Sequence, residues 1–272
     1  MPIHPTAIIA RGAEIDPTAE IGPYCVIDAH VRIAAGARLY QNVYVTGWTQ
    51  IGERCVLHPG VVVGHEPQDV KYHGERSFCR IGSGTVIREH VTIHRGTVPD
   101  SETIVGEDCF LLAGCHVAHN CVLGQRVTLI NNVLLAGHVT IEDRANLGGG
   151  AVVHQFVRIG ELSMIPGNGR VPKDVPPFAL LDVQGRIAGL NRVGMRRAAL
   201  SRDDLADVRE AYRVLFNRTG SWSDALASLE RSVRTDAGRR ILAFVRAAGK
   251  RGVSGRARRS GPRGEAADSV DE

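Results

Sequence analysis

The 272-residue chain is poor in aromatic residues and has no long hydrophobic run. Aromatic side chains make up 5% of the sequence, so Val, Ile, Leu and Ala must fill most of the core. No stretch approaches the roughly 18 consecutive apolar residues of a transmembrane helix, which predicts a protein without an integral membrane segment. The first residues also lack a basic leader followed by an apolar segment, so we expect no secretory signal and a cytoplasmic location.

The cysteines lack the spacing of a metal site. Zinc sites favour two cysteines separated by two residues, and the sequence contains no such pair. Cys79 lies outside any pattern, whereas the other five share one position of the repeat described below: Cys25, Cys55, Cys109, Cys115 and Cys121. We interpret these five as small core residues, and reduced thiols agree with a cytoplasmic protein.

The net charge of +4 hides an asymmetry between the two parts of the chain. Residues 178–272 contain 19 Lys and Arg against 12 Asp and Glu, whereas residues 1–177 have a small acidic excess. A basic segment attracts nucleic acid, an anionic membrane surface or an acidic protein. Because no nucleic-acid-binding motif accompanies this segment, we expect no nucleic acid partner.

A six-residue repeat covers most of residues 3–171. Its copies begin with Ile, Leu or Val and carry a small or β-branched fifth residue, as in IDPTAE, IGPYCV and LAGHVT. The repeat runs from Ile3 to Val63, returns at Ile81, and runs again from Val105 until it fades near Val171. Such a period is typical of short strands separated by tight corners, where Gly, Asn and Asp are favoured.

Three consecutive repeats, each contributing one short strand, make one coil. Successive coils hydrogen-bond at a spacing of about 4.8 Å, and their aliphatic residues stack in a narrow core. The repeat therefore predicts a β-solenoid, a parallel β-helix, over residues 1–177. Residues 65–80 and 99–104 interrupt the repeat, so we expect them to project as loops, which often line the binding face of a solenoid.

The pattern changes after residue 177. Residues 203–216 have the apolar spacing of an amphipathic helix with Ser201 as its N-cap. Residues 223–247 predict further helix, with Ser223 as a cap and a break near residues 236–238. We therefore expect a small α-helical C-terminal domain over residues 178–248. Residues 249–272 contain almost no apolar side chains and are expected to be disordered.

Five histidines lie at outward or corner positions of the repeat: His94, His116, His119, His138 and His154. With three repeats per coil, the last three of these histidines should lie one above another along one edge of the prism. A column of histidines favours a functional site. Either the histidines hold zinc, or one of them is the general base for a hydroxyl that attacks an activated acyl group. The residues alone leave this choice open, although no accompanying ligand pattern supports zinc.

Longer motifs carry a resemblance to a known family: GHEPQDVKYHGE, IREHVTIHRGT, GCHVAHNCVLG, NNVLLAGHVTI, GGGAVVHQFVRIG and KDVPPFAL. Together they closely resemble the bacterial UDP-N-acetylglucosamine O-acyltransferases of lipid A biosynthesis, over about residues 1–217. The resemblance implies a homotrimer of left-handed parallel β-helices, each followed by a helical domain. It also implies transfer of a 3-hydroxyacyl chain from acyl carrier protein to the 3-hydroxyl of UDP-N-acetylglucosamine, without a metal or other cofactor.

The same resemblance implies roles for individual residues. The catalytic base of the family falls on His119, and its oxyanion donor falls on the backbone N–H of Gly137. Gly167 matches the position that limits acyl length, and Asn191 and Arg197 match positions that hold the nucleotide or the pantetheine arm. Substrate contacts fall on Asp69, Lys71, His116, His138, His154 and Gln155, and we expect His94 to join them. Acyl carrier protein is acidic, so the basic C-terminal domain is its expected contact.

Three positions depart from the family pattern. Asn120 follows the base where many members have an Asp, and an Asn orients the ring without stabilising its charged form. Val193 replaces an acidic residue and Ala198 an arginine, so contacts to uracil and to the carrier protein should differ. Two other activities stay open: a related acyltransferase that forms an amide on a 3-amino UDP-sugar, and a non-enzymatic scaffold, which would need neither the histidines nor the loops.

Overall fold

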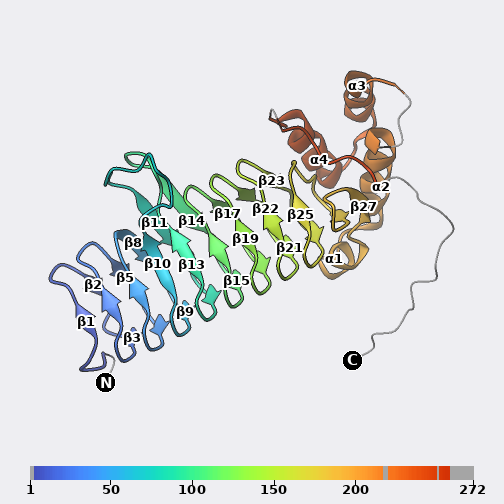
Figure 1. The fold of residues 1–272 in the computed structure, drawn as a ribbon. Coiled ribbons are helices and arrows are strands. Elements are labelled where there is room, and N and C mark those ends of the chain that lie inside the picture. The colour runs from blue at the N-terminus through green and yellow to red at the C-terminus, as the bar shows by residue number, and fades with distance from the viewer. Residues whose placement is uncertain (1–2, 217–219, 250, 258–272) are drawn as a thin grey trace.

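The computed structural model of the chain describes residues 3–216, 220–249 and 251–257. Very short strands follow one another in a long coil, and helices α1 to α4 lie at its C-terminal end (Figure 1). Up to β25, consecutive strands belong to the three sheets in turn, so strands that pair within the coil are three places apart along the chain. The parallel stacking that the repeat predicts is therefore confirmed.

The first sheet of the described chain has nine strands, the second has eight and the third has ten. The first contains β1 (Ile8–Ile9), β4 (Val26–Ile27), β7 (Tyr44–Val45), β10 (Val62–His65), β13 (Thr92–His94), β16 (His116–Val117), β19 (Leu134–Leu135), β22 (Val152–Val153) and β25 (Arg170–Val171). The second contains β2 (Glu14–Ile15), β5 (Arg32–Ile33), β8 (Trp48–Ile51), β11 (Phe78–Ile81), β14 (Glu102–Val105), β17 (Val122–Leu123), β20 (Thr140–Ile141) and β23 (Arg158–Ile159). The third contains β3 (Glu20–Ile21), β6 (Arg38–Leu39), β9 (Val56–Leu57), β12 (Val86–Ile87), β15 (Phe110–Leu111), β18 (Thr128–Leu129), β21 (Asn146–Leu147), β24 (Met164–Ile165), β26 (Ala179–Leu181) and β27 (Ile187–Leu190).

The core is a stack of the aliphatic residues that open each repeat. Val117 pairs with Leu135, and Leu135 pairs with Val153, so that the partners lie one coil apart and all three side chains are buried. The small fifth residues also point inward. All six cysteines are buried free thiols, which confirms the interpretation of the five repeat cysteines as core residues and adds Cys79 to the core.

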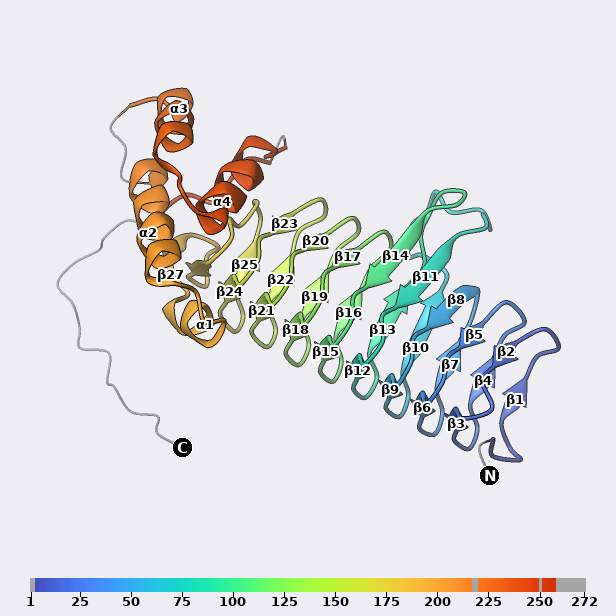
Figure 2. The same cartoon turned by 180° about the vertical axis from the view of Figure 1, so that it is seen from behind.

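Two loops project from the coil because the chain between neighbouring strands is longer there (Figure 2). They are residues 66–77, between β10 and β11, and residues 95–101, between β13 and β14. Both end earlier than the sequence predicts, and the second also begins earlier, at residue 95 instead of residue 99. Residues 78–80 and 102–104 instead lie in long second-sheet strands that pair with each other in parallel.

The C-terminal helices are α1 (Arg192–Arg197), α2 (Arg202–Phe216), α3 (Trp222–Ser232) and α4 (Asp236–Arg246). Ser201 caps α2 as predicted, because its Oγ accepts a hydrogen bond from the N–H of Asp204 at 3.0 Å. The predicted cap at Ser223 is wrong, since Ser221 caps α3 through Asp224. The break between α3 and α4 lies at residues 233–235, where buried Asp207 accepts two backbone N–H groups and the Thr235 hydroxyl.

The segment between the coil and α1 is not helical. Strand β26 pairs in parallel with β24 and antiparallel with β27, so this hairpin extends the third sheet. The apolar run at residues 178–181 therefore continues the coil, and helix begins only at residue 192.

Residues 251–257 return to the end of the coil. Asp174 and Ile187 exchange four backbone hydrogen bonds of 2.8–3.1 Å with Gly252, Ser254, Gly255 and Ala257. These contacts give the last strands a partner within the segment for which the composition predicts disorder. Residues 250 and 258–272, which the same expectation covers, lie outside the described residues.

We expect a chain that ends at Gly249 to be less stable than the full chain by about 2–4 kcal/mol, since each of the four lost hydrogen bonds contributes about 1 kcal/mol. Urea denaturation at matched protein concentration measures the difference. A chain that ends at Ala257 is the control, because it keeps all four bonds and should unfold like the full chain. Equal stability of the two shortened chains would contradict the assigned role of residues 251–257.

Candidate active site

Histidines gather along one edge of the coil, at the turns that lead from the first sheet to the second. We call these turns the histidine edge. His119 follows β16, His138 follows β19, and their rings meet edge to face with centroids 5.2 Å apart. The N–H of His138 donates to the carbonyl of His119 at 3.0 Å, which stacks the two turns. Phe156, in the next turn, stacks on His138 at 4.7 Å.

Gly137 is buried directly beside the ring of His119. A Cβ built on Gly137 would lie 2.6 Å from His119 Nε2, so any side chain there would displace the imidazole. The carbonyl of Gly137 accepts the N–H of Phe156 at 3.1 Å, whereas its own N–H has no hydrogen-bond partner among the described residues. The imidazole of His119 thus contacts Gly137, whose backbone N–H makes no hydrogen bond within the described residues.

A second group of rings lies in the first sheet beside this edge. The His94 ring contacts His116 at 5.0 Å and His65 at 6.0 Å between centroids. His116 Nδ1 lies 2.7 Å from the Thr92 hydroxyl, whereas buried His94 Nδ1 has no hydrogen-bond partner in the described part of the chain. Burial, followed by the charges of neighbouring histidines, lowers the pKa of His94 to about 4. Burial also lowers the pKa of His116 and His138.

The first projecting loop approaches the same edge. The negative charge of Asp69 acts on His138, although burial has the larger effect on the pKa of that ring. Asp69 Oδ1 accepts the N–H of Lys71 at 3.0 Å, and the Lys71 side chain is exposed. Buried Arg95 holds the loop in place, because its Nη2 donates to the Tyr72 hydroxyl at 2.7 Å. His154 and Gln155 are exposed in the turn of Phe156, one coil beyond Gly137.

Asn191 and Arg197 lie elsewhere in the fold. They line a cavity of about 870 Å³ between the third sheet and α1, with a floor of Leu162, Met164, Leu180 and Leu190. Among the described residues, four arginines line it and no carboxylate does: Arg126, Arg144, Arg192 and Arg197. The Asn191 side chain is engaged within the chain, since it caps α1 and donates to the Leu162 carbonyl at 2.7 Å. No described histidine lines this cavity, so one chain does not bring all of the expected site residues together.

The positions that depart from the family pattern occur in both places. Val193 and Ala198 line the cavity with the four arginines, which we call the arginine cavity. Asn120 contacts His119 on the histidine edge. Gly167 lies in a turn from the third sheet to the first, where an added Cβ would make only an ordinary contact, 3.4 Å from the Gly149 carbonyl.

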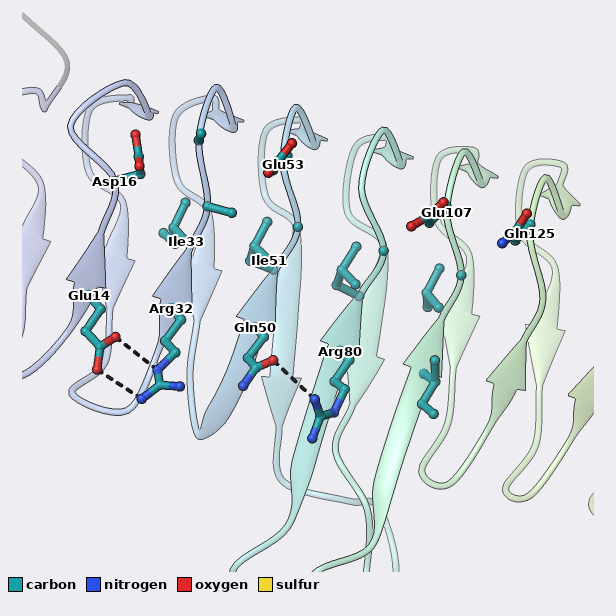
Figure 3. A pocket seen from close by; sticks show the side chains of 18 of the residues that line it. Glu14, Asp16, Arg32, Ile33, Gln50, Ile51, Glu53, Arg80, Glu107 and Gln125 are labelled. Atoms are coloured by element: carbon teal, nitrogen blue, oxygen red, sulfur yellow. Dashed lines mark hydrogen bonds and ion pairs between the residues drawn. The ribbon is translucent and has the colours of Figure 1, made fainter.

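A third hollow lies on the second sheet, nearer the N-terminus (Figure 3). Four of its polar side chains pair across successive coils. Glu14 pairs with Arg32, and Arg80 donates to Gln50 at 3.3 Å. We assign it no part in the site.

Sequence reasoning missed three groups that the structure places at the two sites. Phe156 directly follows His154 and Gln155, and its stacking on His138 could have been inferred because the two residues are one coil apart. Arg126 and Arg144 are one coil apart on the edge that faces the cavity, so the period of the repeat could also have predicted that they are neighbours. Thr97, which contacts Asn120, has no sequence signal because it lies in a projecting loop.

Among residues 3–216, 220–249 and 251–257, no group of three or more His, Cys, Asp or Glu side chains could hold a metal ion. No helix within these residues has both the length and the apolar character needed to span a membrane.

The buried histidines predict that stability falls in mild acid. His94 has a pKa near 6.5 when unfolded and about 4 in the fold, so the unfolded chain binds the proton more tightly. The contribution of His94 to the free energy of unfolding is therefore full above pH 6.5. It falls by about 3 kcal/mol in total as the pH is lowered to about 4. Urea denaturation at pH 7.5 and pH 5 should show a smaller pH effect for His94→Gln than for the natural chain. An unchanged pH effect would contradict this account of His94.

Comparison with known proteins agrees with the family resemblance. A family model described as Udp N-acetylglucosamine O-acyltransferase, domain 2, matches residues 174–254. The acyl-[acyl-carrier-protein]–UDP-N-acetylglucosamine O-acyltransferase of Agrobacterium fabrum is 40% identical over 256 residues, which cover 93% of this chain and 94% of that protein. The protein of the same name from Thermodesulfovibrio yellowstonii is 40% identical over 233 residues, or 85% and 90% of the two chains.

Solved structures give the same result. LpxA from Acinetobacter baumannii superposes with a TM-score of 0.89 at 35% identity, over 93% of this chain and all (100%) of that one. The UDP-N-acetylglucosamine O-acyltransferase of Moraxella catarrhalis superposes with a TM-score of 0.86 at 36% identity, over 93% and 99% of the two chains. This chain therefore belongs to the acyl-[acyl-carrier-protein]–UDP-N-acetylglucosamine O-acyltransferase family.

Proposed function

We propose that this chain transfers a 3-hydroxyacyl group from acyl carrier protein to the 3-hydroxyl of UDP-N-acetylglucosamine, the first step of lipid A biosynthesis. The observation that carries the proposal is the contact between His119, the proposed base, and Gly137, whose backbone N–H is the proposed oxyanion donor. The names of the relatives support the acyl donor and the acceptor.

In the proposed mechanism, His119 Nε2 removes the proton of the sugar hydroxyl as its oxygen attacks the thioester carbonyl. The carbonyl oxygen becomes an oxyanion, which the backbone N–H of Gly137 stabilises. Collapse of the tetrahedral intermediate breaks the carbon–sulfur bond, and the imidazolium returns its proton to the departing thiolate. The enzyme regains its starting state, and no metal or other cofactor takes part in the proposed steps.

We assign the other edge residues to the acceptor. His138 contacts the base, His154 and Gln155 lie in the next turn of the edge, and the loop that carries Asp69 and Lys71 comes near enough for the charge of Asp69 to act on His138. The neutral form of His138, which burial favours by lowering its pKa, suits this task, because an uncharged imidazole both donates to and accepts from sugar hydroxyls. His94 and His116, whose pKa values are lowered by burial, extend the same neutral surface.

We assign the arginine cavity to an anionic group of the substrates, through Arg197 and its neighbours. A diphosphate and a phosphopantetheine arm both carry phosphate, which arginine binds well. The apolar floor suits the uncharged part of either ligand. Asn191 then shapes the cavity as the cap of α1. Gly167 leaves room for the acyl chain, since a side chain there would meet little of this subunit.

We also propose a left-handed coil and a homotrimer. The outer faces of the first and third sheets carry apolar columns: Tyr44, Val62, Leu134 and Val152 on the first, and Val56, Val86, Phe110 and Met164 on the third. The second sheet carries charge instead, as in Glu14, Arg32 and Arg80. Two different apolar faces suit a closed ring of like subunits, each face meeting the other on the next chain. Such a ring would bring the histidine edge of one chain to the arginine cavity of its neighbour.

The domain division and location follow the same proposal. We assign residues 1–177 to the acyltransferase coil and residues 178–248 to a C-terminal domain that begins with the hairpin extending the third sheet. The basic helices of this domain offer a contact for acidic acyl carrier protein. We assign the protein to the cytoplasm, where acyl carrier protein and reduced thiols occur together, as the six free cysteines suggest.

The purified chain should convert UDP-N-acetylglucosamine and a 3-hydroxyacyl carrier protein into a product whose mass has increased by one acyl group. Mild base should cleave the product, because an ester hydrolyses where an amide does not. His119→Ala should lower kcat by about 10² to 10⁴, the usual contribution of a general base. Turnover near that of the natural chain in His119→Ala would contradict the assignment of the base.

Gly137→Ala tests the contact that carries the proposal. The added methyl group occupies the position of the imidazole, so we expect kcat to fall about 10²-fold through misplacement of the base. The control is Gly255→Ala, whose Cβ would have no described heavy atom within 4 Å. It should have the kcat of the natural chain. Equal rates for both variants would mean that the ring of His119 need not lie beside Gly137.

A further inference from the structure

We propose that Thr97 is a positioning residue that acts through Asn120 to keep the proton of neutral His119 on Nδ1. The inference rests on the proposed function only in taking His119 as the base. Thr97 lies in the second projecting loop and reaches Asn120 across a separation of 23 residues. The side chain of Thr97 is not assigned to any substrate.

The direction of the hydrogen bonds fixes the orientation of the Asn120 amide. Asn120 Oδ1 lies 3.2 Å from the backbone N of Thr97 and 2.9 Å from its Oγ1. A backbone N–H can only donate, so the atom that faces Thr97 must be the amide oxygen and not the amide nitrogen. The same oxygen lies 3.0 Å from His119 Nδ1. An amide oxygen can only accept, so Nδ1 of the ring must carry the hydrogen.

This orientation leaves the basic lone pair of the neutral ring on Nε2. Nε2 is the nitrogen beside Gly137, at the point where the proposed mechanism needs a base. If the amide turned over, its NH₂ group would donate to Nδ1 and the ring proton would move to Nε2. That tautomer cannot accept the proton of a hydroxyl at the required position.

The need for Thr97 follows from the amide itself. Both oxygens of a carboxylate accept, so an Asp at this position would select the same tautomer in either orientation. An Asn has one accepting and one donating end, so a second group must select between them. Thr97 supplies two donors to the oxygen and thereby makes the correct orientation the stable one.

Thr97 is held firmly enough to act in this way. Its side chain is 8% exposed, and the segment before it is anchored by buried groups. The Ser77 hydroxyl donates to the Gly96 carbonyl at 2.6 Å, and Arg95 Nη1 donates to the Gly64 carbonyl at 2.9 Å. Asn120 is fixed from its other side, because its N–H donates to the Thr103 hydroxyl at 2.7 Å.

A comparison of four variants tests the proposal by steady-state kinetics. Thr97→Val removes one donor at nearly constant shape, and we expect kcat to fall about tenfold with KM changed less than twofold. Thr97→Ser keeps the hydroxyl and should restore kcat to within twofold of the natural chain. In the Asn120→Asp background, addition of Thr97→Val should change kcat less than twofold. The same tenfold loss in both backgrounds, or no loss in either, would overturn the proposal.

A measurement without catalysis separates this inference from the proposed function. Nitrogen-15 spectra of histidine-labelled full-length protein, assigned with His119→Ala, report which ring nitrogen carries the proton. We expect a protonated Nδ1 and an unprotonated Nε2 in the natural chain, and a larger Nε2-protonated fraction in Thr97→Val. A natural chain with its proton on Nε2 would overturn the proposal whatever the activity, and this test stands if Thr97→Val does not fold. Retained activity in His119→Ala would instead contradict the proposed function.

Discussion

Parallel hydrogen bonding between one coil and the next determines where the side chains of the coil lie. Residues one coil apart pair directly, as Ile9 pairs with Ile27 and Val117 with Leu135. The coil therefore turns a linear repeat into columns, some pointing into the core and others pointing outward or lying at the corners. Histidines that recur about one coil apart therefore become neighbours in space, although they are far apart in the sequence. The site and the core thus depend on the same register.

The register survives the two insertions because both leave the coil. Val62 still pairs with Thr92, and Thr92 with His116, although the chain between these partners is longer than one regular coil. The extra residues form the projecting loops, and those loops supply groups that a regular coil lacks. One loop brings the charge of Asp69 to His138, and the other brings Thr97 to Asn120. Regular coils provide the framework, and the projecting loops add side chains that the repeat does not place at the histidine edge.

Electrostatics along the histidine edge favour neutral rings. Burial lowers the pKa values of His94, His116 and His138, and the mutual repulsion of protonated rings lowers them further. A neutral surface of this kind accepts and donates hydrogen bonds without attracting anions. The arginine cavity has the opposite character, with four cations and no carboxylate among the described residues of its lining. The fold keeps these two surfaces on different edges of one chain.

The repeat by itself determined the parallel coil, the buried positions of the five cysteines that lie within it, and the column that contains His119 and His138. It could do so because a constant number of repeats per coil fixes neighbours without knowledge of anything else. The helix at residues 202–216 was also predictable, since its cap and apolar spacing are local. Only the tertiary structure decided the rest. The hairpin at residues 179–190 and the strand-like segment 251–257 form because the last coil offers unpaired backbone groups. The hydrogen bonds from Asn191 to Leu162 and from Thr97 to Asn120 also join residues whose separations, 29 and 23, follow no repeat.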